Sequence, residues 1–234
     1  MGKMGYGYGS EFHLLRYLGY HRGKLNGEIE KATGRRVIEW LDFVFGGDEK
    51  LDGEWKGVDF LGSASRVKSA WLNFWPQSGN VPNWDAVGRL ESNSEIEYLL
   101  VEAKAHVEEL KSSCTAKDAK QKGGLGKIKD ALTATIKASD SAVEVDRWLR
   151  LYYQYANRLA HLHFLIEHGI PTRLVFIYFC GDDWRGKTLS NGRPPICPKD
   201  ANGWAAALQK MHDHLGLKGS SKLEGRIHKV FLHV

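Results

Sequence analysis

The chain has 234 residues, of which 42% are hydrophobic, and its 33 Lys and Arg outnumber its 28 Asp and Glu. This length and apolar content suffice for a proper core, which excludes a disordered chain and favours one large globular domain. The modest positive charge suits a polyanionic partner without requiring one.

Cysteine usage and apolar runs set further limits. Cys114, Cys180 and Cys197 are widely spaced and form no Cys-x-x-Cys pair, which argues against a disulfide framework or a zinc ribbon. The start "MGKMGYGYGSEF" lacks the unbroken apolar core of a signal peptide, and no later run approaches membrane-spanning length. We therefore predict a cytoplasmic protein that enters no membrane, folded as a single domain over residues 1–234 with residues 1–9 as a flexible leader.

Helical patterns dominate the beginning of the chain. A good N-cap and apolar residues at helical spacing predict a helix over residues 10–20. Residues 24–45 continue a helical pattern that glycine interrupts twice. Residues 65–75 place their apolar side chains on one face and predict an amphipathic helix that stops at Pro76.

Two strand patterns follow a loop rich in Pro, Gly and Asn. "WDAVGRLE", residues 84–91, is short, and "IEYLLVEAKA", residues 96–105, is the strongest strand pattern in the first half. Because a short turn joins them, we expect an antiparallel hairpin. The lysine-rich segment 111–129 is expected to be mobile or helical at the surface. It fits a solvated face, or alternatively a flank that contacts phosphates.

The second half alternates helices and strands. Residues 142–168 form the longest helical pattern, which ends at Gly169, and residues 173–180 form a continuous apolar strand. A helix over residues 200–215 and a strand over residues 227–234 complete the chain. This order predicts an α/β fold with a central mixed sheet flanked by helices.

The apolar strand at residues 96–105 ends in two charged side chains. Side chains alternate along a strand, so Leu100, Glu102 and Lys104 share one face. Buried charges are costly unless they are paired or hold a metal. Asp85, on the neighbouring strand, would bring a second carboxylate to the same edge. Two carboxylates held together favour a shared proton or a divalent cation, and oxygen ligands suit Mg²⁺ or Mn²⁺.

The acid-any-Lys tripeptide is weak evidence by itself, because it recurs four more times in polar turns or helical surfaces. The structural alternative is a salt bridge at the edge of the sheet. Asp59 is a rival for the first acid, but it precedes a helix and a loop instead of lying on the adjacent strand. We therefore prefer Asp85.

"NWDAVG" and "LLVEAKAH", with sixteen residues between Asp85 and Glu102, resemble the motif of the PD-(D/E)XK nuclease superfamily. In that restriction endonuclease-like fold the core order is αβββαβ, and the resemblance covers residues 10–180, with additional helices outside it. Asp85 would match the first acid of the family, Glu102 the second, and Lys104 the lysine. The sequence departs from the motif where Trp84, instead of proline, precedes the first acid.

The resemblance implies a metal-dependent phosphodiester hydrolase with Asp85, Glu102 and Lys104 as catalytic residues. Asp85, Glu102 and the backbone carbonyl of Ala103 would hold Mg²⁺ or Mn²⁺. Lys104 would orient a water or stabilise the developing negative charge. One or two metal ions are compatible with the sequence.

The family also places polar groups on its first helix and on the helix after the motif strand. By that resemblance, Glu11 is a further metal-ligand candidate, and Gln154 and Arg158 are substrate-binding candidates. Glu11 would equally complement a helix N-terminus. A solvent-facing stripe on this helix is the alternative for Gln154 and Arg158, and helical spacing alone slightly favours it.

Three functional hypotheses follow. The leading one is a metal-dependent nuclease that acts on nucleic acid, on DNA in preference to RNA because of the family resemblance alone, with a homodimer left open. The second is a nucleic-acid-binding or interaction module that keeps the fold with little cleavage. The third is an unrelated α/β protein in which Glu102 and Lys104 form a structural ion pair. Trp71, Trp75 and Trp84 are expected in the core, not as platforms for bases.

Overall fold

The computed structural model describes residues 7–41, 54–62, 66–77, 81–92, 96–117 and 124–234. The predicted leader, the predicted loop before residue 84 and the predicted turn between the two strands fall partly outside these residues, and so does the lysine-rich segment at 118–123.

The described chain contains helices, strands and short 3-10 helices. The helices are α1 (Ser10–Tyr20), α2 (Arg22–Thr33), α3 (Val67–Phe74), α4 (Leu125–Ala138), α5 (Val145–Trp148), α6 (Tyr153–Glu167) and α7 (Ala201–Leu215). The strands are β1 (Val37–Trp40), β2 (Trp55–Lys56), β3 (Asn83–Trp84), β4 (Ala86–Leu90), β5 (Glu97–Lys104), β6 (Thr172–Cys180) and β7 (Ile227–His233). The 3-10 helices span Asp59–Leu61, Val107–Leu110, Trp184–Gly186 and Glu224–Arg226.

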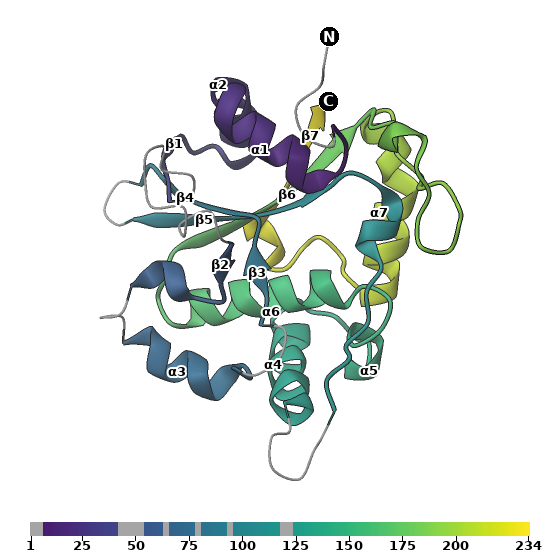
Figure 1. Cartoon of the computed structure of the whole chain (residues 1–234). Coiled ribbons are helices and arrows are strands. Elements are labelled where there is room, and N and C mark those ends of the chain that lie inside the picture. The colour runs from purple at the N-terminus through teal and green to yellow at the C-terminus, as the bar shows by residue number, and fades with distance from the viewer. Residues whose placement is uncertain (1–6, 42–53, 63–65, 78–80, 93–95, 118–123) are drawn as a thin grey trace.

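A five-stranded mixed sheet forms the centre, in the order β1-β4-β5-β6-β7 (Figure 1). β1, β4 and β5 pair antiparallel, whereas β6 and β7 continue the sheet in parallel with β5. β2 and β3 form a separate two-stranded sheet. The predicted hairpin of β4 and β5 and the predicted mixed sheet are therefore confirmed.

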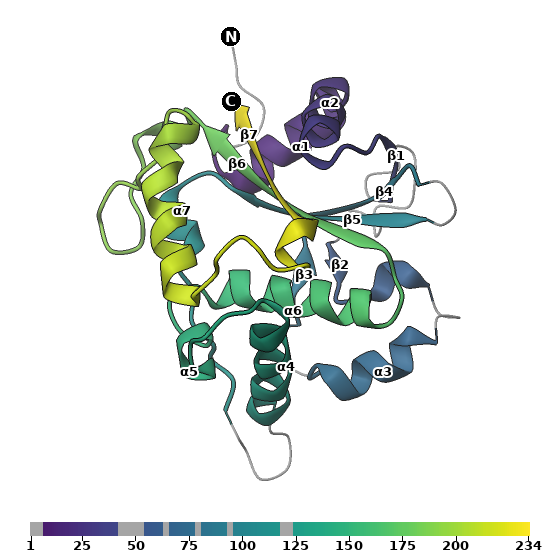
Figure 2. The same ribbon diagram turned by 180° about the vertical axis from the view of Figure 1, so that it is seen from behind.

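Helices cover both faces of this sheet (Figures 1 and 2). α1 and α2 pack on one face, and α3, α4, α6 and α7 contribute to the core on the other. The apolar strand β6 serves both cores through its alternating side chains, with Val175, Ile177 and Phe179 on the α1 side and Leu174, Phe176 and Tyr178 on the α6 side. This two-sided burial is why its sequence is continuously apolar.

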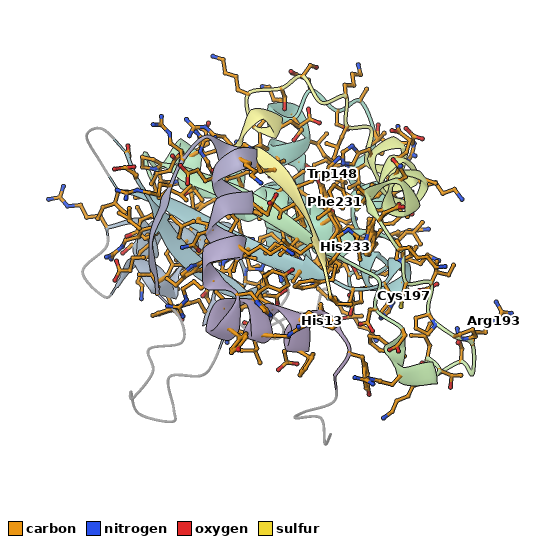
Figure 3. The ribbon with its side chains drawn as sticks, turned by 90° about the horizontal axis from the view of Figure 1, so that it is seen from above. His13, Trp148, Arg193, Cys197, Phe231 and His233 are labelled. Atoms are coloured by element: carbon orange, nitrogen blue, oxygen red, sulfur yellow. The ribbon has the colours of Figure 1, made fainter. Side chains whose placement is uncertain are left out.

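α1 is tied to the ends of β6 and β7, which lie beside it (Figure 3). The Tyr17 hydroxyl donates to the backbone carbonyl of His233 over 2.7 Å. His13 lies 3.0 Å from the carboxylate of Asp182, just beyond β6. The same carboxylate accepts the N–H of Gly9 at the start of α1 over 2.7 Å. Asp182 therefore has structural partners, and the N-terminal helix is fixed to one end of the sheet.

The helical prediction for residues 24–45 is wrong for residues 34–41, and residues 42–45 lie outside the described residues. Gly34 has a φ of 67°, and this left-handed residue ends α2. β1 follows as an edge strand that pairs with β4. Only Val37 and Trp40 of its four residues are buried, so the strand shows no alternation that a sequence pattern could reveal.

The single helix predicted over residues 142–168 is two helices, α5 and α6. Between them Leu151 has a φ of 63°. The carbonyls of Leu149 and Leu151 accept hydrogen bonds from Cys114 and Ser112 over 2.8 and 2.7 Å, respectively. These carbonyls are turned towards a distant segment, which interrupts the helix.

The lysine-rich region is less superficial than its composition predicts. Residues 111–117 run extended along the start of α6, and α4 begins at Leu125. Ile128 and Leu132 of α4 are buried in the core beside α6. No helix in the described ranges combines the length and the apolar composition that a membrane span needs.

Candidate active site

Asp85 lies between β3 and β4 and is held against the end of β5. Its backbone N–H donates to the carbonyl of Val101 over 3.2 Å, and its Oδ2 accepts the N–H of Ala103 over 2.7 Å. In a strand the N–H and C=O of one residue point to the same neighbour, so the Ala103 carbonyl also faces the Asp85 side. One carboxylate and one carbonyl therefore lie together at this edge.

Glu102 is buried near the end of β5, with 1% of its surface exposed. Its Oε1 accepts hydrogen bonds from the Lys104 ammonium and, over 2.8 Å, from the Gln154 amide. Its Oε2 accepts from Nε of Arg158 over 2.6 Å. Glu102 and Lys104 share a face, as strand alternation predicts, and both are paired.

Arg158 completes this network from α6. Its guanidinium also donates to the Asn157 side chain over 3.0 Å and to the Asn83 carbonyl over 2.6 Å. The arginine is only 4% exposed. The alternative of a solvent-facing stripe on this helix is wrong, because Gln154 and Arg158 both donate to Glu102.

Burial and the neighbouring charges shift the pKa values of these groups. Burial, followed by repulsion from Glu102, raises the pKa of Asp85 to about 7. Burial alone would raise the pKa of Glu102, but Arg158 and Lys104 outweigh it and lower that pKa. Burial opposes the ammonium form of Lys104, yet Glu102 and Asp85 raise its pKa. Glu102 and Lys104 are therefore charged at neutral pH, whereas Asp85 is poised to titrate.

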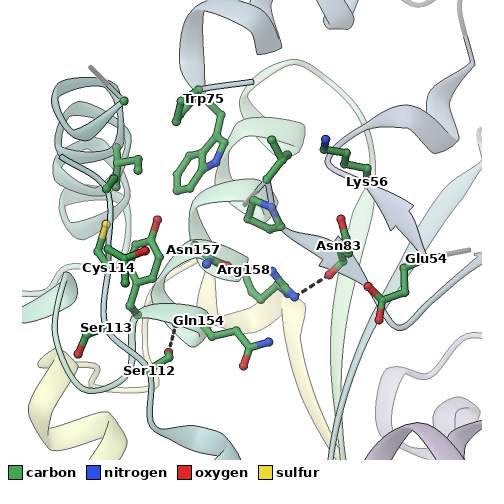
Figure 4. A pocket seen from close by; sticks show the side chains of 18 of the residues that line it. Glu54, Lys56, Trp75, Asn83, Ser112, Ser113, Cys114, Gln154, Asn157 and Arg158 are labelled. Carbon is green, nitrogen blue, oxygen red and sulfur yellow. Dashed lines mark hydrogen bonds between the residues drawn. The ribbon is translucent and has the colours of Figure 1, made fainter. Parts of the chain in front are cut away.

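A cavity of about 980 Å³ opens beside Asp85 (Figure 4). Its walls come from the β2–β3 sheet, from residues 112–117 and from α6, and they carry Lys56, Asn83, Ser112, Cys114, Gln154 and Arg158. Glu102 and Lys104 line a much smaller adjoining cavity that shares Gln154. Asp85 and Glu54 are thus the carboxylates that a molecule in the large cavity would meet, whereas Glu102 does not line it.

Glu11 stands apart from this group. It is exposed in the first turn of α1, and no contact between described residues joins it to Asp85 or Glu102. Glu109 occupies the space between α1 and the end of β5. Its carboxylate accepts the Ala105 N–H over 2.6 Å and the Ser10 hydroxyl over 3.2 Å. No sequence pattern selects Glu109, because it is a 3-10 turn that brings this residue back to the strand.

Asp59 lies off the strand next to β5, and the three tryptophans lie in the core, as predicted from the sequence. Asp59 is exposed on a 3-10 helix and pairs with Lys68 over 3.3 Å, away from the carboxylate pair. Trp71, Trp75 and Trp84 are buried in the core, although Trp75 also lines the large cavity.

The oxygen atoms around Asp85 fit a hard divalent cation. Among the described residues, none donates a hydrogen bond to Asp85 Oδ1, and a cation there would offset the repulsion from Glu102. The described part of the chain gathers no three His, Cys, Asp or Glu side chains that would form a metal site without backbone ligands. The candidate ligands are Asp85, Glu102 and the Ala103 carbonyl.

Comparison of the chain with protein-family models, with curated proteins and with solved structures finds no significant match.

Proposed function

We propose that this chain is a divalent-metal-dependent nuclease of the PD-(D/E)XK type, which hydrolyses phosphodiester bonds of DNA in preference to RNA. The fold supports the proposal. A helix precedes the antiparallel strands β1, β4 and β5, and α6 then leads to the parallel strand β6. If β2, α3, β3, α4 and α5 are taken as insertions, this order matches the αβββαβ core of the superfamily and so supports the proposal. The choice of DNA rests on the sequence resemblance.

The observation that carries the proposal is the position of Asp85. This carboxylate binds the backbone of Ala103, next to the paired Glu102 and Lys104, and it lines a large cavity. A cleft with a carboxylate of perturbed pKa and fixed charges beside it is a typical active-site arrangement.

Each residue has a role that follows from its contacts. Asp85, Glu102 and the Ala103 carbonyl would hold Mg²⁺ or Mn²⁺, which polarises a phosphate and lowers the pKa of a bound water. Lys104 keeps its proton because Glu102 and Asp85 stabilise the ammonium, so it supplies fixed positive charge to an anionic transition state. Gln154 and Arg158 orient Glu102, and both line the cavity in which substrate would lie.

Cleavage of a DNA duplex by the purified chain with Mg²⁺ or Mn²⁺ tests the proposal. Asp85→Asn keeps an oxygen for the Ala103 N–H but removes the charge, so we expect cleavage to fall roughly 100-fold or more. Asp59→Asn is the matched control, because this exposed acid lies outside the site and its substitution should leave cleavage unchanged. A folded Asp85→Asn protein that cleaves at the wild-type rate would contradict the proposal.

One observation favours a second candidate, a nucleic-acid-binding module without cleavage. Both oxygens of Glu102 are already bound within the protein, as in a closed structural ion network. Fluorescence anisotropy with labelled DNA distinguishes the two. A module without cleavage would bind DNA equally well with EDTA or Mn²⁺, and Asp85→Asn would not alter that binding.

A further inference from the structure

Each nitrogen of the Arg158 guanidinium donates a hydrogen bond within the protein. Nε donates to Glu102, and the two terminal nitrogens donate to Asn157 and to the Asn83 carbonyl. Its central carbon also lies 4.9 Å from the centre of the Trp84 ring. A buried arginine with these partners has one orientation, and it joins β5, β3 and α6 beside Asp85.

Arg158 occupies one of the two carboxylate oxygens of Glu102. Oε2 of Glu102 accepts from Arg158, and Oε1 accepts from Lys104 and Gln154. A metal ion on the Arg158 side would have to displace a charged hydrogen bond of 2.6 Å. Removing one partner of a buried ion pair is costly, so this side of Glu102 is closed.

The carboxylate of Asp85, unlike that of Glu102, has an oxygen that accepts no hydrogen bond from the described residues. Oδ2 of Asp85 accepts the Ala103 N–H, while Oδ1 receives no hydrogen bond from the described residues. Asp85 also lines the large cavity, which Glu102 does not. An ion that enters from the cavity would therefore meet the Asp85 carboxylate before that of Glu102.

The charges of the site also favour a single metal ion. The ammonium of Lys104 and the guanidinium of Arg158 together balance the carboxylates of Asp85 and Glu102. One divalent ion makes this group positive, which suits an anionic phosphodiester. A second divalent ion would add its charge to a group that already contains two fixed cations, and like charges held close together are unfavourable.

We propose that Arg158 is a positioning residue that takes the place of a second metal ion, so that the site binds a single divalent cation on its Asp85 side. This inference rests on the proposed function, because it assumes that Asp85 holds a metal. It makes Arg158 a fixed part of the site that acts through Glu102.

Isothermal titration with Mn²⁺, supported by EPR of the bound ion, tests this stoichiometry. The number of specific sites is the number of Mn²⁺ ions bound by wild type minus the number bound by Asp85→Asn. This subtraction removes adventitious surface sites from the count. We expect one ion for wild type and one for Arg158→Lys, which keeps the charge. We expect two for Arg158→Gln, because this substitution frees Oε2 of Glu102 and removes a cation.

Two specific ions in wild type would overturn the inference, and so would one ion with unchanged affinity in a folded Arg158→Gln protein. If circular dichroism shows that Arg158→Gln does not fold, the counts for wild type and Arg158→Lys decide. Two ions together with DNA cleavage would reject only the inference. The absence of both specific Mn²⁺ binding and cleavage would reject the proposed function itself.

Discussion

At the scale of single residues, His161 on α6 is a buried base enclosed by aromatic rings. Its ring centre lies 4.4 Å from that of Trp71, 5.0 Å from that of Trp75 and 5.7 Å from that of Trp84. Its Nδ1 lies 2.7 Å from the Asn157 carbonyl and donates to it. Burial lowers the pKa of His161 to about 3, and the histidine is therefore neutral in the folded protein.

His161 should make the protein sensitive to acid. The unfolded chain takes up a proton at this residue near pH 6.5, whereas the folded chain takes one up only near pH 3. The free energy of unfolding should therefore fall with decreasing pH across this window, by about 1.4 kcal/mol per pH unit from His161 alone. Urea unfolding from about pH 7 to about pH 4 measures the slope.

His161→Phe should flatten this slope by about one bound proton, because phenylalanine retains the ring in the aromatic enclosure and cannot be protonated. His233→Phe, at an exposed side chain on β7, is the matched control and should keep the wild-type slope. Equal slopes in wild type and His161→Phe would show that this histidine is not the buried neutral base.

Single residues of the candidate site differ in how far the sequence could predict them. Glu102 and Lys104 could be placed on one face, because a strand has a fixed period of two. Arg158 could be chosen as a polar residue on a helix, but the direction it faces depends on how α6 packs on the sheet. Its bond to Glu102 joins residues 56 positions apart, and no local pattern encodes that contact.

At the scale of elements, the turn between α5 and α6 is a strained connection. Leu151 has a φ of 63°, in the left-handed region, which is unfavourable for a residue with a Cβ atom. The residue is 41% exposed. The carbonyl of Leu151 accepts from Ser112, and its N–H donates to the Ser113 hydroxyl over 3.2 Å. Backbone contacts with residues 112–113 therefore hold Leu151 in this conformation.

Leu151→Gly should stabilise the protein despite the loss of a side chain. Glycine adopts positive φ without the cost of about 1–2 kcal/mol, which exceeds the entropy that it loses on folding. We expect the free energy of unfolding to rise by about 0.5–1 kcal/mol, measured by urea denaturation. Leu72→Gly is the matched control at a 53% exposed position in helix α3, and it should lower that free energy by about 1 kcal/mol.

A destabilised Leu151→Gly protein would mean that the leucine side chain contributes more than its exposure indicates.

The same turn also explains an error of sequence-based prediction. The apolar spacing over residues 142–168 is helical throughout, and the break arises from hydrogen bonds to Ser112 and Cys114, which lie outside that window. β5, β6 and β7 were predictable because their apolar patterns are long enough to show a period.

At the scale of the whole molecule, Glu97 joins segments that are distant in the sequence. It begins β5 and is buried. Arg173 of β6 lies 3.0 Å from its carboxylate, Arg226 before β7 donates to it over 2.7 Å, and Arg35 before β1 lies 3.9 Å away. Glu97 therefore connects the N-terminal half of the sheet to its C-terminal strands. Its position on β5 is roughly 17 Å from that of Glu102 along the strand.

Glu97→Gln should destabilise the fold without altering the candidate site. Three guanidinium groups would surround a neutral amide, and breaking a buried ion pair by removing one partner is costly. Because Arg35 and Arg226 are partly solvated, we expect a loss of about 2 kcal/mol in the free energy of unfolding. Urea denaturation measures this loss, and Mn²⁺ titration of the folded variant should match wild type.

Glu91→Gln is the control for this charge removal. Glu91 pairs with Arg36 over 3.0 Å at the surface, where both side chains are mostly solvated, so Glu91→Gln should lower the free energy of unfolding far less than Glu97→Gln. If Glu97→Gln costs no more than Glu91→Gln, the arginines around Glu97 are not held together by its charge. If Glu97→Gln changes Mn²⁺ binding in the folded protein, the two ends of β5 are coupled through the sheet. The separation of stability from binding therefore depends on both comparisons.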